Sequence, residues 1–411
     1  MSWVSMAQTI TPQQEAQLIE RAILDLQGLP LTVLRDRQQL QARAQAAVAQ
    51  VSQHLSLVLT PALAAALAQT VAARLGGLGV LDELLPPNRN DLSEISMNPD
   101  GSLWLLRKGQ RFFEKHNRQP SLGETWRSVE ALLSPMGRAI SEASPTVDAK
   151  LPRSEGMGGA RIKVVHPLLA PGSGYPAISI RLFEPRPVAP EQLLAWQMLP
   201  QSVLDGLLAA VGAGARLLVI GGTATGKTTL LSALAHGIPK HARIVKIEDP
   251  EEIWLPHENV VTLEARPRVV GSEVPGYSLS DGVDDAMRMA PNWLIVGEVR
   301  TGSAALSLFR AQMSDHPGLS TLHAEGPDAA IQRLGVLMWA DAQVRIEAAK
   351  ELFTMSVDLV VQVGWREGRR SLLGVWEVEP QLRSGNVAFR RLYQPGDPAM
   401  AAFTRRTNEG G

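Results

Sequence analysis

A buried strand followed by a glycine-rich loop and a helix is the feature that most constrains this chain. Residues 216–232 read RLLVIGGTATGKTTLLS. The apolar run at 217–220 predicts a strand that is buried on both faces of a parallel sheet. Gly221, four further residues and Gly226-Lys227-Thr228 follow it, and leucines at helical spacing come next. This order of strand, loop and helix predicts a phosphate-binding loop of the Walker A type.

The chemistry of such a loop assigns roles to its residues. Its backbone N–H groups and the N-terminus of the following helix favour bound phosphate, and glycine allows the close approach of the backbone. We expect Lys227 to bridge the β- and γ-phosphates of ATP and Thr228 to ligate Mg²⁺. The predicted nucleotide-binding residues of the loop are Gly221, Gly222, Thr223, Ala224, Thr225, Gly226, Lys227, Thr228 and Thr229.

Composition bounds the class of protein. The chain has 411 residues, 45% hydrophobic and 20% charged, which predicts a soluble protein with more than one domain. Its net charge of −1 provides no basic field, so nucleic acid is not expected as a direct ligand. The absence of cysteine excludes disulfides, cysteine-ligated zinc and a cysteine nucleophile, and it fits a cytoplasmic location.

Two interpretations of the N-terminal region are compared: a segment inserted in a membrane, and soluble helices. The first ten residues lack the pattern of a signal peptide. Residues 55–73 carry no charge and have the length of a membrane span. However, Thr60-Pro61 has the pattern of a helix cap followed by proline at the first helical position. We therefore predict two soluble helices here rather than a span.

Changes of hydrophobic period divide the first part of the chain. Residues 1–80 predict a helical N-terminal extension, which begins with a capping box at Thr11. We interpret it as a small packing bundle, with a partner-docking helix pair as the alternative. From Leu92 the period shifts toward two, and the turn Asp100-Gly101 between apolar runs predicts a hairpin. Residues 81–183 are therefore predicted to form a smaller α/β N-terminal domain.

The second part of the chain follows a proline-rich stretch. Residues 184–199 begin with EPRPVAP and predict a stiff linker. Within residues 200–411, apolar strands alternate with helices, which predicts an α/β domain with a mainly parallel sheet covered on both faces. The predicted strands lie at 217–220, 243–247, 260–263, 293–296 and 319–322, and a terminal hairpin is expected over 357–378.

Acidic side chains follow two of these strands. Glu298 comes after the strand at 293–296, at the sheet edge where ligands of open α/β sheets lie. We expect it to hold Mg²⁺ through water, and the alternative is that it caps the next helix or pairs with Arg300. Glu252 ends the cluster Glu248-Asp249-Pro250-Glu251-Glu252. It is the candidate base for water activation, although charge runs of this kind are often solvated turns.

Histidine and arginine complete the set of candidates. His323 follows the strand at 319–322 and is positioned to sense the γ-phosphate, whereas the alternative is a structural histidine. An arginine finger accelerates phosphoryl transfer by roughly 10³–10⁵ where one operates. Spacing alone does not select among the arginines on or beside strands, which are Arg161, Arg181, Arg266, Arg288 and Arg300.

The ordered motifs resemble those of the type II/IV secretion ATPases, and in particular the CpaF- and TrbB-like motors of type IV secretion, conjugation and pili. The similar stretches over about residues 75–378 are GGTATGKTTLL, IEDPEEI, AMRMAPNWLIVGEVR and HPGLSTLHAEGPDAAIQRL. The resemblance implies a RecA-like fold and catalytic roles for Glu252, Glu298, Lys227 and His323. It also implies nucleotide contacts from Arg161 and Arg181, in GGARIKV and ISIRLF, and from Arg288.

The resemblance further implies a function and an assembly. We expect a homo-hexameric, Mg²⁺-dependent ATPase that powers secretion, conjugative transfer or pilus assembly and retraction. It would be cytoplasmic, peripheral at the bacterial inner membrane, and would contact inner-membrane components of that machine, without zinc. The alternatives are a DNA-translocating P-loop ATPase or nucleotide kinase, and an assembly subunit that binds ATP without hydrolysing it.

Overall fold

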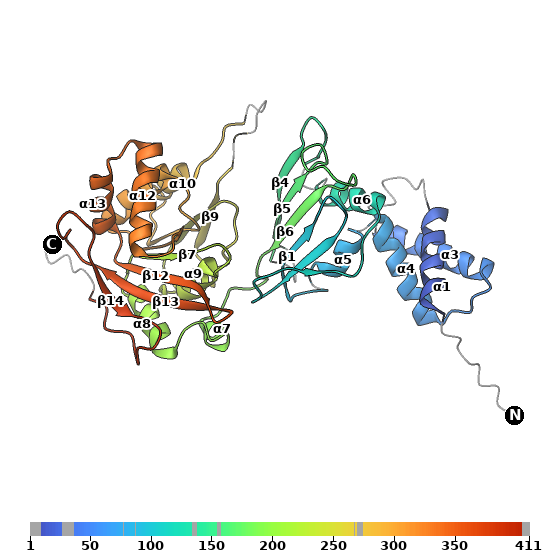
Figure 1. The fold of residues 1–411 in the computed structure, drawn as a ribbon, viewed down its shortest axis with the longest axis horizontal. Coiled ribbons are helices and arrows are strands. Elements are labelled where there is room, and N and C mark those ends of the chain that lie inside the picture. The colour runs from blue at the N-terminus through green and yellow to red at the C-terminus, as the bar shows by residue number, and fades with distance from the viewer. Residues whose placement is uncertain are drawn as a thin grey trace. The chain divides into compact units, whose positions relative to one another are not determined.

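The chain consists of two compact units, Met1–Phe183 and Glu184–Gly411. The computed structural model describes residues 10–26, 37–76, 78–86, 88–133, 138–153, 158–266, 268 and 274–404. Both units are coloured along the chain in Figure 1, from blue at the N-terminus to red at the C-terminus.

The first unit begins with helices that pack on one another. Helices α1 (Pro12–Asp25), α3 (Arg37–His54) and α4 (Pro61–Gly76) share a core of leucine, valine and alanine side chains. The predicted capping box is present, because Thr11 Oγ1 accepts the N–H of Gln14 at 3.2 Å and Gln14 Oε1 accepts the N–H of Thr11 at 2.9 Å. The hydroxyl of Thr60 accepts the N–H of Leu63 at 3.3 Å. The prediction that a new helix starts at Pro61 is therefore confirmed.

None of the helices among the described residues combines the length and the apolar character that crossing a membrane requires.

The rest of the first unit is an antiparallel sheet with helices on one face. Its strand order is β3-β2-β1-β6-β5-β4, and every pairing in it is antiparallel. Alternate residues of β5 are buried against α5 and α6, as expected for a sheet covered on one side. The strands are β1 (Leu92–Met97), β2 (Leu103–Arg107), β3 (Glu114–Lys115), β4 (Thr146–Leu151), β5 (Ala160–Val165) and β6 (Ala177–Leu182), and the helices are α5 (Val80–Leu84) and α6 (Leu122–Leu133).

The second unit contains a mainly parallel sheet in the order β14-β13-β12-β7-β11-β10-β8-β9. Every pairing from β12 to β9 is parallel, and β13 and β14 add an antiparallel edge. The predicted strands and terminal hairpin are all present, and β14 is an additional strand. The strands are β7 (Leu217–Gly221), β8 (Ile244–Glu248), β9 (Val260–Glu264), β10 (Trp293–Val296), β11 (Gly318–His323), β12 (Leu359–Arg366), β13 (Arg369–Val378) and β14 (Phe389–Tyr393).

Helices cover both faces of this sheet, which explains why its central strands β7, β8 and β10 are buried throughout. Alternate residues of β7 enter different cores: Leu217 and Val219 pack with α7, α8 and α9, while Leu218 and Ile220 pack with α10 to α13. Figure 1 shows the two groups of helices on opposite sides of the sheet. The helices are α7 (Pro190–Ala195), α8 (Gln201–Gly212), α9 (Lys227–Leu234), α10 (Leu279–Ala286), α11 (Gly302–Met313), α12 (Pro327–Ala342) and α13 (Ile346–Ser356), and a 3₁₀ turn follows α9 at Ala235–Gly237.

The stretch predicted as a linker, 184–199, differs from the expectation in its second half. Residues Pro190–Ala195 form α7, because proline at the first helical position has the φ that a helix requires. Val188, Leu193 and Met198 are buried in the core of the second unit. The apolar residues after the prolines therefore anchor this segment by packing, which a composition rich in proline did not indicate.

Candidate functional site

The phosphate-binding loop has the backbone geometry that its glycines predict. Strand β7 is buried over its whole length, and α9 begins at Lys227. Gly226 caps this helix with φ +94°, a conformation that side chains other than glycine rarely adopt. A Cβ atom on Gly221 would lie 2.3 Å from the carbonyl oxygen of Val363 on β12. Both glycines are thus required by the local geometry.

Lys227 is held against its own loop. Its side chain is buried, and Nζ donates to the carbonyl oxygens of Gly222 at 2.8 Å and Gly221 at 3.2 Å. The hydroxyl of Thr225 donates to the same Gly222 carbonyl at 2.9 Å. Gly222, Thr223 and Ala224 are exposed, while Thr228 and Thr229 are half-buried at the first turn of α9. The tip of the loop is therefore exposed to solvent, while its lysine is buried beneath the tip.

His323 joins this loop to the acidic residue of a neighbouring strand. Its strand β11 pairs with β7 so that His323 lies opposite Gly221. The ring nitrogen Nδ1 lies 3.4 Å from Lys227 Nζ, and Nε2 lies 2.8 Å from Glu298 Oε1. Burial and the nearby Lys227 charge lower the pKa of His323, although Glu298 opposes them. The lowered pKa favours the neutral form of the imidazole that lies between the lysine and the carboxylate.

Glu298 follows β10 and has a second partner. Its Oε2 accepts from Arg300 Nε at 2.5 Å, so the alternative that the sequence left open, an ion pair with Arg300, is present. Nη1 of Arg300 also donates to the carbonyl oxygen of Asp249 at 3.4 Å. Arg300 thus connects the segment after β10 to the acidic segment after β8. Thr321 on β11 adds a further link, since its hydroxyl donates to the Gly297 carbonyl at 2.7 Å.

A small cavity of about 40 Å³ brings these segments together. Residues from the loop helix and from the two acidic segments line it, namely Thr228, Glu248, Asp249, Pro250, Glu252, Leu279, Gly297, Glu298 and Arg300. Its volume is of the order of one or two water molecules. The carboxyl ends of adjacent parallel strands meet at one edge of a sheet, and for this reason residues far apart in the sequence share the cavity.

Glu248 is a site residue that the sequence reasoning did not single out. It is the last residue of β8 and is buried, and its Oε1 accepts the backbone N–H groups of Glu252 at 3.0 Å and Ile253 at 2.9 Å. Burial raises its pKa, while the Lys246 ammonium acts in the opposite direction. The available signal was that Glu248 directly follows the predicted strand at 243–247, as the first residue of the acidic cluster.

The structure separates the candidate arginines. Arg300 lines the cavity. Arg288 does not: its side chain is 81% exposed and lies 3.6 Å from Asp285. Nη2 of Arg266 donates to the Pro275 carbonyl at 2.9 Å. Arg161 and Arg181 belong to the first unit, where they lie opposite each other on β5 and β6.

The oxygen atoms at the cavity fit a magnesium ion in their chemistry. Mg²⁺ prefers oxygen ligands, keeps several waters and takes one or two carboxylates together with substrate phosphates. The Thr228 hydroxyl and the Glu298 carboxylate are ligands of this type. Among the described residues, no three histidine, aspartate or glutamate side chains are grouped as a metal site of their own. A metal here would therefore depend on phosphate oxygens and water for the rest of its shell.

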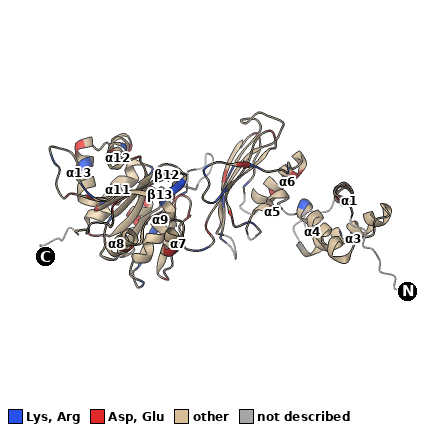
Figure 2. Cartoon of the chain, turned by 60° about the horizontal axis from the view of Figure 1, so that its bottom comes forward, with Lys and Arg blue, Asp and Glu red and all other residues tan. Residues whose placement is uncertain are grey.

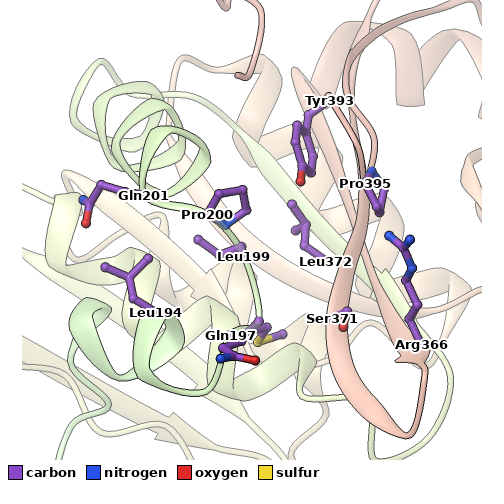
Figure 3. Close-up of a pocket in the computed structure, with 11 residues that line it drawn as sticks. Leu194, Gln197, Leu199, Pro200, Gln201, Arg366, Ser371, Leu372, Tyr393 and Pro395 are labelled. Carbon is purple, nitrogen blue, oxygen red and sulfur yellow. The ribbon is translucent and has the colours of Figure 1, made fainter. Parts of the chain in front are cut away.

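A larger pocket of about 520 Å³ lies in the second unit. One wall comes from the end of α7 to the first residue of α8, with Leu194, Gln197, Leu199, Pro200 and Gln201 (Figure 3). The other wall comes from β12, β13 and the end of β14 with the residues after it, namely Arg366, Ser371, Leu372, Tyr393 and Pro395. The walls are joined by a 2.8 Å hydrogen bond from the Leu372 N–H to the Met198 carbonyl. Met198 also lies 3.6 Å from where a Cβ on Gly226 would be.

Charge is dispersed over the chain. Figure 2 shows basic and acidic residues scattered through the helices and strands of both units, in keeping with the net charge of −1. Such a distribution produces local ion pairs instead of a long-range field of one sign.

The second unit is thus an α/β unit with a phosphate-binding loop and carboxylates at adjacent strand ends. A family model described as type II/IV secretion system protein matches residues 111–363. The chain belongs to the type II/IV secretion ATPase family. PtlH, a type IV secretion system protein of Bordetella pertussis, is 33% identical over 70% of this chain and 91% of its own length. The probable conjugal transfer protein TrbB of Sinorhizobium fredii is 28% identical over 71% and 84%.

Other relatives align over less of their length, and solved structures support the fold. An uncharacterized protein of Methanocaldococcus jannaschii is 36% identical over 199 residues, which are 48% of this chain and 34% of that protein. The pilus retraction motor PilT has a TM-score of 0.52 at 19% identity, covering 75% of this chain and 84% of PilT. The Legionella pneumophila ATPase DotB has a TM-score of 0.51 at 20% identity, covering 70% and 77%. At these identities the likeness is one of fold.

Proposed function

We propose that this protein is a Mg²⁺-dependent ATPase that powers macromolecular secretion, conjugative transfer or pilus assembly and retraction. The observation that carries the proposal is the cavity that Thr228, Glu252 and Glu298 line together. A phosphate-binding loop beside two carboxylates provides what hydrolysis of a γ-phosphate requires: positive charge, a metal ligand and a group that orients water.

The roles of the residues follow from their positions. Lys227 exchanges its bonds to the loop carbonyls for phosphate oxygens, and the loop N–H groups stabilise the remaining charge. Glu252 would orient or deprotonate the attacking water, and Thr228, together with Glu298 through water, would hold the metal. Bound Mg²⁺ would neutralise charge on the β- and γ-phosphates. Neutral His323, between Lys227 and Glu298, couples the occupancy of the loop to the carboxylate.

The larger pocket is the proposed site for the base and ribose. Its volume of about 520 Å³ falls in the range of small-molecule sites, which are mostly apolar with a few polar groups. Tyr393, Leu372 and Pro200 offer apolar surface, and Gln197 and Ser371 offer polar groups. Met198 places one wall next to Gly226, so a nucleoside in this pocket would lead directly to phosphates at α9.

The remaining expectations are proposals that the family membership supports. The protein would act as a homo-hexamer in the cytoplasm, peripheral at the inner membrane, with inner-membrane components of its machine as partners. The proposed domains are a helical extension (1–80), an N-terminal α/β domain (81–183) and a RecA-like domain (200–411), to whose core the segment 184–199 adds α7. Arg161 and Arg181 of the N-terminal domain would add positive charge to the nucleotide. Arg300, unlike Arg288, lies at the cavity and is a further source of charge.

Lys227→Ala tests the proposal, with Lys240→Ala as its control on an exposed lysine. Steady-state phosphate release from MgATP should fall by at least roughly 10²–10³-fold in Lys227→Ala, because an electrostatic contact to developing charge is lost. Its circular dichroism spectrum should stay that of the wild type. Unchanged turnover would reject the proposal, and ATP binding without any release by the wild type would favour a non-hydrolysing assembly subunit. Strong stimulation by DNA would favour a translocase.

A further inference from the structure

A buried lysine on β8 stands out among apolar neighbours. Lys246 is 3% exposed on a strand that is buried throughout. It lies opposite Ile295 of β10 on one side and Thr262 of β9 on the other. A buried ammonium is expensive unless it is paired and hydrogen-bonded. An aliphatic residue would satisfy the same position in a parallel sheet, so the packing of the sheet does not explain the charge.

The partners of Lys246 all belong to one short segment. Nζ donates to Glu248 Oε2 at 3.0 Å, to Glu251 Oε1 at 2.7 Å and to the Ile253 carbonyl oxygen at 2.5 Å. Glu248 in turn accepts the N–H groups of Glu252 and Ile253. Lys246 and Glu248 are two residues apart and so lie on the same face of the strand. Together they bind the backbone on both sides of Glu252.

This segment has no regular structure that would fix it otherwise. Residues 251–255 have neither helical nor strand structure, and buried backbone groups must still find partners. The N–H groups of Glu252 and Ile253 and the Ile253 carbonyl are satisfied by the side chains of Glu248 and Lys246. Beyond them, Ser232 of α9 donates to the Trp254 carbonyl at 3.2 Å, and Ile253 is buried in the core.

We propose that Lys246 is a positioning residue for the catalytic step: its buried ion-pair network with Glu248 and Glu251 holds Glu252 at the cavity. The inference rests on the proposed function, since Glu252 is the proposed base. Removing the ammonium leaves Glu248 buried without its cation and leaves the Ile253 carbonyl without its donor. The segment then relaxes, and Glu252 loses its placement relative to Thr228 and Glu298. The hydrogen bonds of Lys246 run to Glu248, Glu251 and Ile253 and not to the phosphate-binding loop, so we expect the loop to keep its nucleotide.

Three measurements on the full chain test this, with Lys246→Met and the exposed control Lys240→Met. Hydrogen exchange read by mass spectrometry reports on the amides of residues 249–255, and it should become at least roughly tenfold faster in Lys246→Met, because bonds to charged groups are lost. Single-turnover hydrolysis of MgATP should slow by roughly 10²-fold, the effect of about 1 Å of misplacement. The affinity for a fluorescent ATP analogue with Mg²⁺ should change less than about twofold, since ground-state binding is retained.

Glu251→Ala gives a second route in case Lys246→Met does not fold. Glu251 is the partly exposed member of the network, at 23%. Its removal should accelerate exchange in the same segment and slow hydrolysis by roughly fivefold, since one bond to a charged group is lost. If both folded variants keep wild-type exchange, or exchange faster but hydrolyse at the wild-type rate, the positioning role is wrong. A wild-type chain that hydrolyses nothing would instead refute the proposed function, and exchange would still report whether Lys246 holds the segment.

Discussion

The two sheets of this protein place their polar residues in different ways. In the antiparallel sheet of the first unit, β5 alternates between buried and half-buried residues, and its polar side chains spread along the uncovered face. In the parallel sheet of the second unit, β7, β8 and β10 are buried throughout. Apart from Lys246 in the middle of β8, the polar groups follow or end these strands at their carboxyl ends, which lie at one edge of the sheet. The parallel sheet thus gathers polar side chains at one edge, while the antiparallel sheet spreads them along one face.

This difference explains which residues the sequence could bring together. Lys227, Glu252, Glu298 and His323 each follow or end a buried strand, and the structure places them around one loop and one cavity. Arg161 and Arg181 lie across a face of the other sheet, between Lys150 on β4 and Glu94 on β1. These two arginines lie within strands and not at strand ends, so the sequence alone does not indicate whether they contact a ligand.

The largest expected effect on turnover comes from the arginines on the face of the antiparallel sheet. We predict that Arg161→Ala/Arg181→Ala lowers kcat for MgATP by roughly 10³–10⁵-fold if these arginines stabilise the transition state. Lys163→Ala is the matched control, because Lys163 shares the strand and face of Arg161. Phosphate release and thermal unfolding should be measured for both. If the double variant keeps full turnover, the antiparallel face has no catalytic role, and Arg300 at the parallel edge becomes the arginine to test.

Glu252→Gln tests the parallel edge itself. Losing a general base typically lowers kcat by 10²–10⁴-fold, and a neutral amide of the same size should leave nucleotide affinity unchanged. Glu258→Gln, an exposed residue farther along the same segment, should behave as the wild type. Single-turnover hydrolysis distinguishes the two. A Glu252→Gln variant with normal turnover would assign water activation to another carboxylate of the cavity.

Substitutions of adjacent residues in β10 and in β5 test whether the two sheets differ in how many faces are buried. The quantity compared is the free energy of unfolding. Leu294→Ala and Ile295→Ala on β10 should each cost about 2–5 kcal/mol, because both side chains are fully buried and each leaves a cavity. On β5, Ile162→Ala should cost the same, whereas Lys163→Ala should stay within about 0.5 kcal/mol. Urea unfolding measures all four. Equal costs at the two β5 positions would show that its outer face is covered.

A surface carboxylate provides the smallest effect. A hydrogen bond from Arg89 lowers the pKa of Asp91 to about 2, below its ordinary value of 3.8. The charged form therefore stabilises the fold above about pH 4, and this contribution is lost as the pH falls toward 2. Asp91→Asn should remove less than about 1 kcal/mol at pH 7, because the pair is exposed and screened by solvent. The difference from the wild type should vanish near pH 2 in thermal unfolding, and a difference that persists there would exclude the charge as its cause.

Much of the second unit could be read from the sequence because its signals are local. A strand, a glycine-rich loop and a helix are contiguous, and apolar runs of parallel strands are unmistakable. Helix α7 inside the predicted linker was missed because prolines hid the apolar residues that pack into the core. Strand β14 was missed because it is defined by pairing with β13, which is not a local property.

The parts of the site that were not foreseen depend on side chains meeting across segments. Nothing in the spacing distinguishes Arg300 from Arg288, yet one lines the cavity and the other is exposed. The charges of Lys246 and Glu248 within a strand were visible, but their joint hold on the backbone around Glu252 requires the path of the chain. The pocket between the α7–α8 segment and β12–β14 likewise forms only when distant segments pack.

Gly221 is the point at which the phosphate-binding loop packs against strand β12. Its hydrogen leaves room for the Val363 carbonyl, which lies within 2.3 Å of where any larger substituent would begin. The first residue of the loop therefore rests directly on β12, the strand that leads into the hairpin wall of the larger pocket. A methyl group at position 221 would act as a wedge, displacing the hairpin and the loop together. The phosphate-binding loop and the hairpin wall of the larger pocket are thus mechanically continuous at this one position.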